Sequence, residues 1–195
     1  MTSADVLILG GGSGGYACAL RSAELGLSVI LIDKDKLGGT CLHRGCIPTK
    51  ALLHAAEVAD SSRESENFGV KTSFEGIDMP KVNESRDGVV ARLYKGLQGL
   101  VKSRNVTFVE GEGTLIDPQT IEVNGVKYTG KNVVLATGSY AKSIPGLEIS
   151  GPIMTSDQAL NLDYVPKSVI VLGGGVIGVE FASVWKSFGA DVTIV

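Results

Sequence analysis

One pattern of residues occurs twice in the sequence, 163 positions apart, and it limits the fold more than any other feature. Each copy has a short apolar run, a cluster of glycines, a helical stretch and a second apolar run. The shift places Gly10 on Gly173, Gly12 on Gly175, Gly15 on Gly178, Gly26 on Gly189 and Val29 on Val192. A match in register over a whole strand–helix–strand length indicates a duplicated dinucleotide-binding unit.

The apolar runs at 6–9 and 29–32 do not alternate with polar residues, which is typical of parallel strands buried on both faces. Further strands are predicted at 106–109, 114–116, 120–123, 126–128 and 133–136, and helices at 16–25, 48–62 and 80–104. Asn124-Gly125 favours a tight hairpin turn. The sequence therefore predicts an α/β fold. A Rossmann-like domain over 1–145 has a parallel sheet with an antiparallel β insertion, and the start of a second Rossmann-like domain follows over 146–195.

Composition excludes several classes of protein. The net charge is −3 and no block of like charges occurs, which argues against a nucleic-acid surface. No apolar run approaches the roughly eighteen residues that are needed to span a bilayer. The first strand starts almost at the N-terminus with no signal or transit segment before it, so we expect a cytoplasmic protein.

The first glycine cluster fits the pattern G-x-G-x-x-G at positions 10, 12 and 15. Gly10 permits a tight turn, Gly12 lets the backbone approach a pyrophosphate, and Gly15 allows the strand and the helix to pack closely. The phosphate would lie at the positive N-terminus of the helix. Asp33 ends the second strand and can accept a hydrogen bond from a ribose hydroxyl.

Cys41 and Cys46 lie close together in a segment that is rich in glycine and proline. On a regular helix, residues five apart point about 140° away from each other. A disulfide between them therefore requires an irregular turn, which Gly45 could permit. Helix signals follow from Pro48, so Cys46 would face the positive end of a helix, which stabilises a thiolate. Lys50 could add positive charge from one turn away.

Three other interpretations compete with a redox-active cysteine pair. A zinc site needs three or four ligands, and only His43 and His54 could supplement the cysteines without carboxylates. Two unrelated buried thiols are unusual in a segment punctuated by glycine and proline. A structural disulfide is disfavoured in a reducing compartment. The pattern favours the redox-active pair, and no metal site is predicted.

The segment 38–50 resembles the redox motif of the class I pyridine nucleotide–disulfide oxidoreductases. Cys-Ile-Pro-Thr-Lys followed by Ala-Leu-Leu-His is most similar to the members that oxidise dihydrolipoamide, and the resemblance covers essentially the whole chain. His43-Arg44 stands where many members have Asn-Val, and Asp33 stands where Glu is usual. The resemblance implies FAD at the first glycine turn and NAD at the second.

A role for each matching residue follows from the resemblance. Cys46 would be the thiol nearer the flavin, and Cys41 the interchange thiol that exchanges with the substrate. Lys50 would lie near flavin N5, and Glu180 near the nicotinamide. The other implied contacts to FAD come from Gly10, Gly12, Gly15, Asp33, Gly39, Thr40, Gly113, Thr137 and Gly138, and those to NAD from Gly173, Gly175 and Gly178.

The implied activity is oxidation of dihydrolipoamide through the Cys41–Cys46 disulfide and FAD to NAD⁺. The implied partners are a carrier domain of a 2-oxoacid dehydrogenase complex or of the glycine cleavage system, and a second copy in a homodimer. The alternatives are another low-molecular-weight disulfide reductase, of glutathione or mycothione type, and a non-catalytic nucleotide-binding fragment. The repeat puts the equivalent of Asp33 at position 196, one past the end, so we expect a partial sequence that lacks turnover alone.

Overall fold

The computed structural model describes residues 2–195, and contacts divide the chain into two compact units. The first unit comprises the chain up to His43 together with Ala91–Lys142, and the second comprises Arg44–Val90 together with Ser143–Val195. Within residues 2–195, no helix has both the length and the apolar character to cross a membrane. The division into domains over 1–145 and 146–195 stays a prediction.

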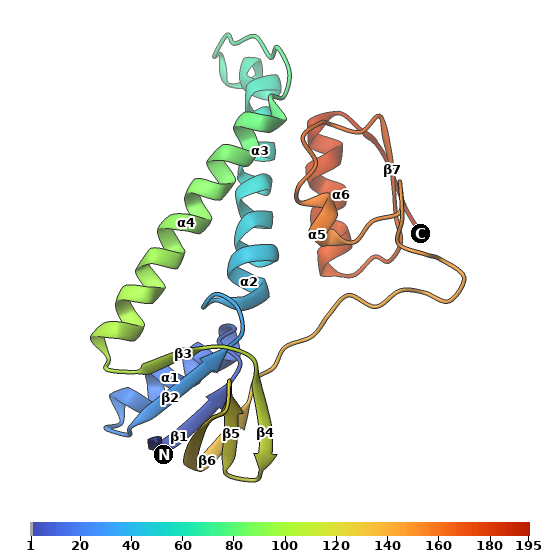
Figure 1. Ribbon diagram of the computed structural model, residues 1–195. Helices are drawn as coiled ribbons and strands as arrows, with labels where there is room; N and C mark the ends of the chain where they lie inside the picture. The colour runs from blue at the N-terminus through green and yellow to red at the C-terminus, as the bar shows by residue number, and fades with distance from the viewer. Residues whose placement is uncertain (1) are drawn as a thin grey trace. The chain divides into compact units, whose positions relative to one another are not determined.

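The first unit is built on one six-stranded sheet, with strand order β3-β2-β1-β6-β5-β4 (Figure 1). Helix α1 (Ser13–Glu24) connects β1 to β2, and β1 pairs in parallel with both β2 and β6. β3 pairs in parallel with β2, while β4, β5 and β6 form an antiparallel meander. The strands are β1 Thr2–Leu9, β2 Val29–Asp33, β3 Thr107–Glu110, β4 Gly113–Asp117, β5 Thr120–Val123 and β6 Val126–Leu135. The predicted parallel sheet with an antiparallel insertion is confirmed.

The central strand β1 is buried on both faces, as its unbroken apolar run predicts. Val6 and Ile8 pack in one core cluster with Ala19 of α1 and Val101 of α4 (Met79–Ser103). The intervening Leu7 packs in a second cluster, which includes side chains of the antiparallel strand β5. Successive side chains of a strand point to opposite faces, so a continuous apolar run supplies both clusters. The carboxyl ends of β1, β2 and β6 therefore meet at one edge.

Strand β6 differs from the prediction. The apolar runs at 126–128 and 133–136 predict two separate strands, whereas the structure has one continuous strand, Val126–Leu135. Its first half pairs with β5 and its whole length from Tyr128 pairs with β1. The polar stretch between the runs resembles a loop in the sequence. Two contacts with β1 hold this stretch in the strand. Gly130 has no side chain and so packs closely against Leu7, where an added Cβ would lie 2.6 Å from Leu7 Cβ. The Lys131 ammonium lies 2.7 Å from the carboxylate of Asp5.

The second unit contains a smaller strand–helix–strand element. Its two strands, β7 and β8, are parallel, and α6 connects them. Trp185 is buried in the core of this unit and contacts Phe188 edge to face, with 6.1 Å between ring centroids. Leu52 and Ala56 belong to the same core cluster. The elements of this unit are α3 Cys46–Glu64, η1 Ser65–Phe68, α5 Ser156–Ala159, β7 Ser168–Val171, α6 Val176–Phe188 and β8 Asp191–Ile194. Helix α2, Gly39–Arg44, spans the boundary between the two units in the sequence.

The sequence repeat is also a repeat of hydrogen bonds. The Gly10 N–H donates to Ile32 O at 2.7 Å, and 163 positions later the Gly173 N–H donates to Val195 O at 2.8 Å. Both helices end in the same way, with bonds from Gly26 N–H to Ala23 O (3.0 Å) and from Gly189 N–H to Lys186 O (3.1 Å). Strand register agrees as well, since Val6 pairs with Val29 and Val169 with Val192. The duplicated unit is therefore confirmed in three dimensions.

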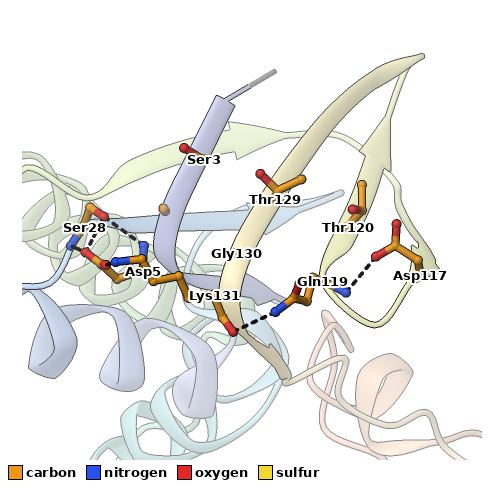
Figure 2. A pocket seen from close by; sticks show the side chains of 10 residues that line it. Ser3, Asp5, Ser28, Asp117, Gln119, Thr120, Thr129, Gly130 and Lys131 are labelled. Atoms are coloured by element: carbon orange, nitrogen blue, oxygen red, sulfur yellow. Dashed lines mark hydrogen bonds and ion pairs between the residues drawn. The ribbon is translucent and has the colours of Figure 1, made fainter.

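Asp5 connects three segments of the first unit at a polar hollow near the amino end of β2 (Figure 2). Its carboxylate accepts hydrogen bonds from the Ser28 backbone N–H (2.9 Å), the Ser28 hydroxyl (2.6 Å) and the Lys131 ammonium (2.7 Å). The Lys131 ammonium, and after it Ser28, hold the pKa of Asp5 well below its usual range. Because the pKa of Asp5 is lowered in the folded state, the charged carboxylate contributes its full stabilisation above the unfolded-state pKa of about 3.9. This stabilisation decreases as the pH falls from there through the lower pKa of the folded state.

We expect Asp5→Asn to lower the urea midpoint at pH 7, where the carboxylate is charged in both the folded and the unfolded state, and to have a smaller effect at pH 3, where the unfolded-state carboxylate is largely protonated. Unfolding curves at the two pH values test this. Glu148→Gln, which neutralises an exposed carboxylate outside the cluster, serves as the control and should leave the pH 7 midpoint unchanged. An Asp5→Asn deficit of equal size at both pH values would show that the loss is not electrostatic.

Candidate nucleotide-binding and redox site

The first glycine turn has no space for side chains at two of its predicted positions. Gly10 adopts φ +107°, a left-handed conformation that favours glycine, and an added Cβ there would collide with the carbonyl of Ala136. At Gly15 an added Cβ would collide with the Gly10 carbonyl. Gly12 caps the N-terminus of α1, and Tyr16 N–H donates to its carbonyl at 2.9 Å. The turn therefore directs the N-terminus of α1 to the carboxyl edge of the sheet.

Asp33 lies at this edge, at the end of β2. Its carboxylate accepts hydrogen bonds from the backbone N–H of Gly11, within the glycine turn, and of Asp35 at 2.8 Å. The acid that the sequence analysis places beside a ribose thus contacts the turn that it places beside the pyrophosphate. The structure brings these two predicted parts of a nucleotide site together, and the nucleotide itself stays a prediction.

Thr137 and Gly138 lie at the same edge, because they follow β6, the neighbour of β1 in the sheet. The Ala136 N–H donates to Leu9 O at 2.7 Å, which fixes the start of this segment beside the glycine turn. Both Thr137 and Gly138 are exposed. Gly113 has a different environment, because an added Cβ would lie 2.6 Å from Leu9 Cδ1 and 2.9 Å from Ile121 Cγ2. Gly113 is thus packed against side chains of the core, and its predicted contact with FAD stays a prediction.

The sequence patterns did not indicate three residues that interact at this edge, which are Lys34, Glu112 and Tyr140. Lys34 follows Asp33 directly, and its ammonium lies 3.6 Å from the carboxylate of Glu112. A hydrogen bond with Tyr140, and then the charge of Glu112, raise the pKa of Lys34. Its position immediately after a predicted strand could have marked Lys34, but a contact between residues so far apart in sequence has no local signal.

The segment that carries Cys41 begins on the first glycine turn. The Gly38 N–H donates to Gly11 O at 2.9 Å, and Gly12 and Gly38 form an isolated parallel bridge. Gly39 adopts φ +57°, and a Cβ there would lie 2.6 Å from Gly12 Cα, so only glycine fits this contact. Helix α2 starts at Gly39, exposes Thr40 and carries Cys41 as a half-buried residue. The segment that carries the first cysteine is thus tied through backbone contacts to the edge that carries the first glycine turn.

The two predicted redox cysteines lie on consecutive helices that Gly45 separates. Helix α2 ends at Arg44, and α3 begins at Cys46, two residues earlier than the predicted start at Pro48. The Thr49 N–H and hydroxyl both donate to the Gly45 carbonyl, at 3.0 and 2.7 Å, which fixes the first turn of α3 from Cys46 onward. Cys46 is exposed. The irregular turn is thus present at Gly45, while the disulfide stays a prediction.

Two predicted site residues form an ion pair within the second unit. The Lys50 ammonium and the Glu180 carboxylate are in contact, although they are 130 positions apart in sequence. Glu180 lies on α6, directly after the second glycine turn, in which Gly173 adopts φ +105° and Gly178 packs against the Gly173 carbonyl. Gly175 caps the N-terminus of α6, as Gly12 caps that of α1. The second turn therefore has the geometry of the first.

The hollow in Figure 2 lies elsewhere. It is lined by Asp5, Ser28, Lys131 and their neighbours at the amino end of β2, whereas the glycine turn follows the carboxyl end of β1. Residues 2–195 also contain no group of three or more His, Cys, Asp or Glu side chains placed to hold a metal ion.

Glycine turns at two equivalent junctions, each between a parallel strand and a helix and each in its own sheet, define an α/β protein of the dinucleotide-binding Rossmann type. The sequence profile of the family described as pyridine nucleotide-disulphide oxidoreductase matches residues 4–195. The chain belongs to this family.

Relatives with curated descriptions cover nearly all of the chain. Dihydrolipoyl dehydrogenase of Bacillus subtilis is 44% identical, over 100% of this chain and 44% of that protein. Dihydrolipoyl dehydrogenase of Acholeplasma laidlawii is 44% identical, over 98% of this chain and 59% of its own length. Dihydrolipoyl dehydrogenase 1, mitochondrial, of Arabidopsis thaliana is 43% identical, over 98% and 39% respectively. The chain spans between 39% and 59% of the length of these three relatives.

Proposed function

We propose that the protein is a dihydrolipoyl dehydrogenase, which oxidises dihydrolipoamide through a Cys41–Cys46 disulfide and FAD and passes the electrons to NAD⁺. The observation that carries this proposal is the backbone contact of Gly38 and Gly39 with the first glycine turn, which ties the cysteine-bearing helix to a nucleotide-binding edge. The curated names of the relatives support the substrate.

The residues at the first turn fit the diphosphate of FAD. An added Cβ at Gly14 would meet no atom within 4 Å, and one at Gly12 would meet only Gly39 Cα at 3.8 Å, so the N-terminus of α1 is open to a ligand. Backbone N–H groups and the helix dipole favour an anion there. Asp33 would hold the ribose, and Thr137 and Gly138 would line the same edge. FAD, when bound, supplies the two-electron redox chemistry that connects the dithiol to the nicotinamide.

The cysteines exchange electrons with the substrate by thiol–disulfide exchange. A thiolate of dihydrolipoamide attacks Cys41 Sγ, the Cys41–Cys46 bond breaks, and Cys46 leaves as a thiolate. The second substrate thiol then attacks the substrate sulfur that is bound to Cys41. The two substrate sulfurs form the disulfide of oxidised lipoamide, the bond to Cys41 Sγ breaks, and Cys41 leaves as a thiol. The substrate loses two electrons and two protons, and the protein gains a dithiol. The position of Cys46 at the N-terminus of α3 favours it as the leaving group.

The second glycine turn is the proposed site for the nicotinamide nucleotide. Gly173, Gly175 and Gly178 repeat the geometry of the first turn. Glu180 is proposed to lie near the nicotinamide, and Lys50, which contacts it, near flavin N5. The proposal extends to a homodimer in the cytoplasm, with dihydrolipoamide presented by a carrier domain of a 2-oxoacid dehydrogenase complex or of the glycine cleavage system.

A comparison of substrates tests the proposed function. The assay uses the full-length protein, because residues 1–195 alone are not expected to turn over. Initial rates are measured for NAD⁺ reduction by dihydrolipoamide and for the reduction of glutathione disulfide by NADH and by NADPH. We expect turnover with dihydrolipoamide and NAD⁺ only. Turnover with glutathione disulfide alone would assign the protein to another disulfide reductase, and the absence of turnover with any pair would favour a non-catalytic nucleotide-binding protein.

The roles of the two cysteines predict a change in their order of reactivity. In reduced protein stripped of flavin, iodoacetamide should label the exposed Cys46 faster than the half-buried Cys41. With FAD bound, Cys46 should be protected and Cys41 should become the main site of labelling. Peptide mass spectrometry measures both rates, and Cys18, which lies on α1 away from the motif, is the internal control. Protection of Cys41 by FAD instead of Cys46 would reverse the assigned roles.

A further inference from the structure

His43 lies between the two cysteines and anchors α2 to the first unit. Its Nε2 atom is 2.8 Å from the backbone carbonyl of Leu37, and its ring contacts Tyr94 edge to face, with centroids 5.1 Å apart. A carbonyl oxygen can only accept, so Nε2 carries the proton and donates. Leu37 is 3% exposed and belongs to the core cluster of β1 and α1. The hydrogen bond therefore fixes α2 to a rigid part of the fold.

Helix α2 has only six residues, and an isolated helix of that length is not stable in water. Its conformation therefore depends on contacts with the rest of the unit, and the His43 side chain supplies two of them. A disulfide between Cys41 and Cys46 would close a ring that includes His43. When His43 is held in place, the dithiol form has less conformational freedom to lose on closing this ring. The effective concentration of the Cys41 thiol near the Cys46 thiol is therefore higher.

We propose that His43 is a positioning residue, which holds α2 so that Cys41 can close the disulfide with Cys46, and that its Nε2–H···O bond to Leu37 is the main contribution. The inference rests on the proposed function, because it requires a reversible Cys41–Cys46 disulfide. The equilibrium concerned is protein dithiol plus glutathione disulfide giving protein disulfide plus two glutathione thiols. Two electrons and two protons pass from the protein to glutathione disulfide.

Two substitutions separate the hydrogen bond from the ring contact. His43→Phe keeps an aromatic ring beside Tyr94 but has no donor, while His43→Gln keeps a donor near the position of Nε2 but has no ring. We expect His43→Phe to lower the equilibrium constant for disulfide formation about fivefold, which is the order of effect of one hydrogen bond. His43→Gln should stay within a factor of about two of the wild type. His54→Phe, at an exposed histidine of α3, is the matched control and should have no effect.

The measurement equilibrates each purified protein with mixtures of glutathione and glutathione disulfide, then quenches, alkylates and determines the disulfide fraction by mass spectrometry. Equal constants for His43→Phe and His54→Phe, or equal losses for His43→Phe and His43→Gln, would overturn the role of the hydrogen bond. If the wild type forms no Cys41–Cys46 disulfide in any mixture, that result contradicts the proposed function itself. The positioning role of His43 is then contradicted as well, because it requires this disulfide.

A measurement on the unaltered protein covers the case in which His43→Phe does not fold. Nitrogen-15 NMR of the labelled histidines reports the Nε2–H proton of His43 directly. We expect this proton to exchange with solvent more slowly in the disulfide form than in the dithiol form, because closing the ring and forming the hydrogen bond stabilise each other. Identical exchange in the two forms would contradict the coupling.

Discussion

Replacement of Cys46 by serine in the full-length protein is expected to lower the rate of NAD⁺ reduction by dihydrolipoamide about a thousandfold or more, because a hydroxyl cannot form the disulfide through which the electrons pass. The protein should still bind FAD, since Cys46 follows the irregular turn at Gly45 and takes no part in the packing of the first glycine turn. Steady-state rates with dihydrolipoamide and the absorbance of bound flavin measure the two properties.

Two controls make this result specific. Cys18→Ser changes a half-buried cysteine of α1 outside the motif and should retain activity. Reduction of ferricyanide by NADH needs the flavin and the nicotinamide site but no disulfide, so Cys46→Ser should retain it. If Cys46→Ser kept more than roughly a tenth of the dihydrolipoamide activity, Cys46 would not be an obligatory part of the path.

Gly15→Ala is expected to destabilise the first unit by about 2–4 kcal/mol, because the added methyl group has no space against the Gly10 carbonyl and the backbone must move. The same movement would displace the N-terminus of α1 from the edge where FAD is proposed to bind. We therefore expect the variant to be purified with little or no flavin. The flavin content per protein and the thermal unfolding midpoint measure these effects.

Gly14→Ala provides a control one residue away. An added Cβ at Gly14 meets nothing within 4 Å, and the residue lies in the first turn of α1. Alanine forms helices better than glycine, so the stability should be unchanged or higher by up to about 1 kcal/mol. A similar loss of stability in both variants would mean that the collision at Gly15 is not the cause.

Much of the fold follows from local patterns in the sequence. The unbroken apolar runs of β1 and β2 correctly predict strands buried on both faces, and Asn124-Gly125 correctly predicts a tight hairpin, in which both residues have positive φ. The repeat of Gly10 at Gly173 predicts two equivalent turns, because both glycines adopt a positive φ, +107° and +105°, that favours glycine. These features are local, so single-sequence reasoning can find them.

Features that depend on distant residues could not be predicted in this way. The polar stretch inside β6 stays in the sheet because Lys131 pairs with Asp5, 126 positions earlier. The pairing of Lys50 with Glu180 and the cluster around Lys34 likewise join segments that have no common sequence pattern. The early start of α3 at Cys46 was missed because Pro48 gave the stronger local signal for a helix start, although Thr49 fixes the turn before it through the Gly45 carbonyl.

The central claim is that Cys41 and Cys46 form a disulfide that exchanges electrons with dihydrolipoamide and with bound flavin. The most direct test is an anaerobic titration of the purified, flavin-loaded protein with dihydrolipoamide, in which flavin absorbance and protein thiols are measured together. We expect the thiols of Cys41 and Cys46 to appear as the flavin spectrum changes, and Cys46→Ser to abolish both responses. An unchanged thiol count and an unchanged flavin spectrum in the wild type would contradict it.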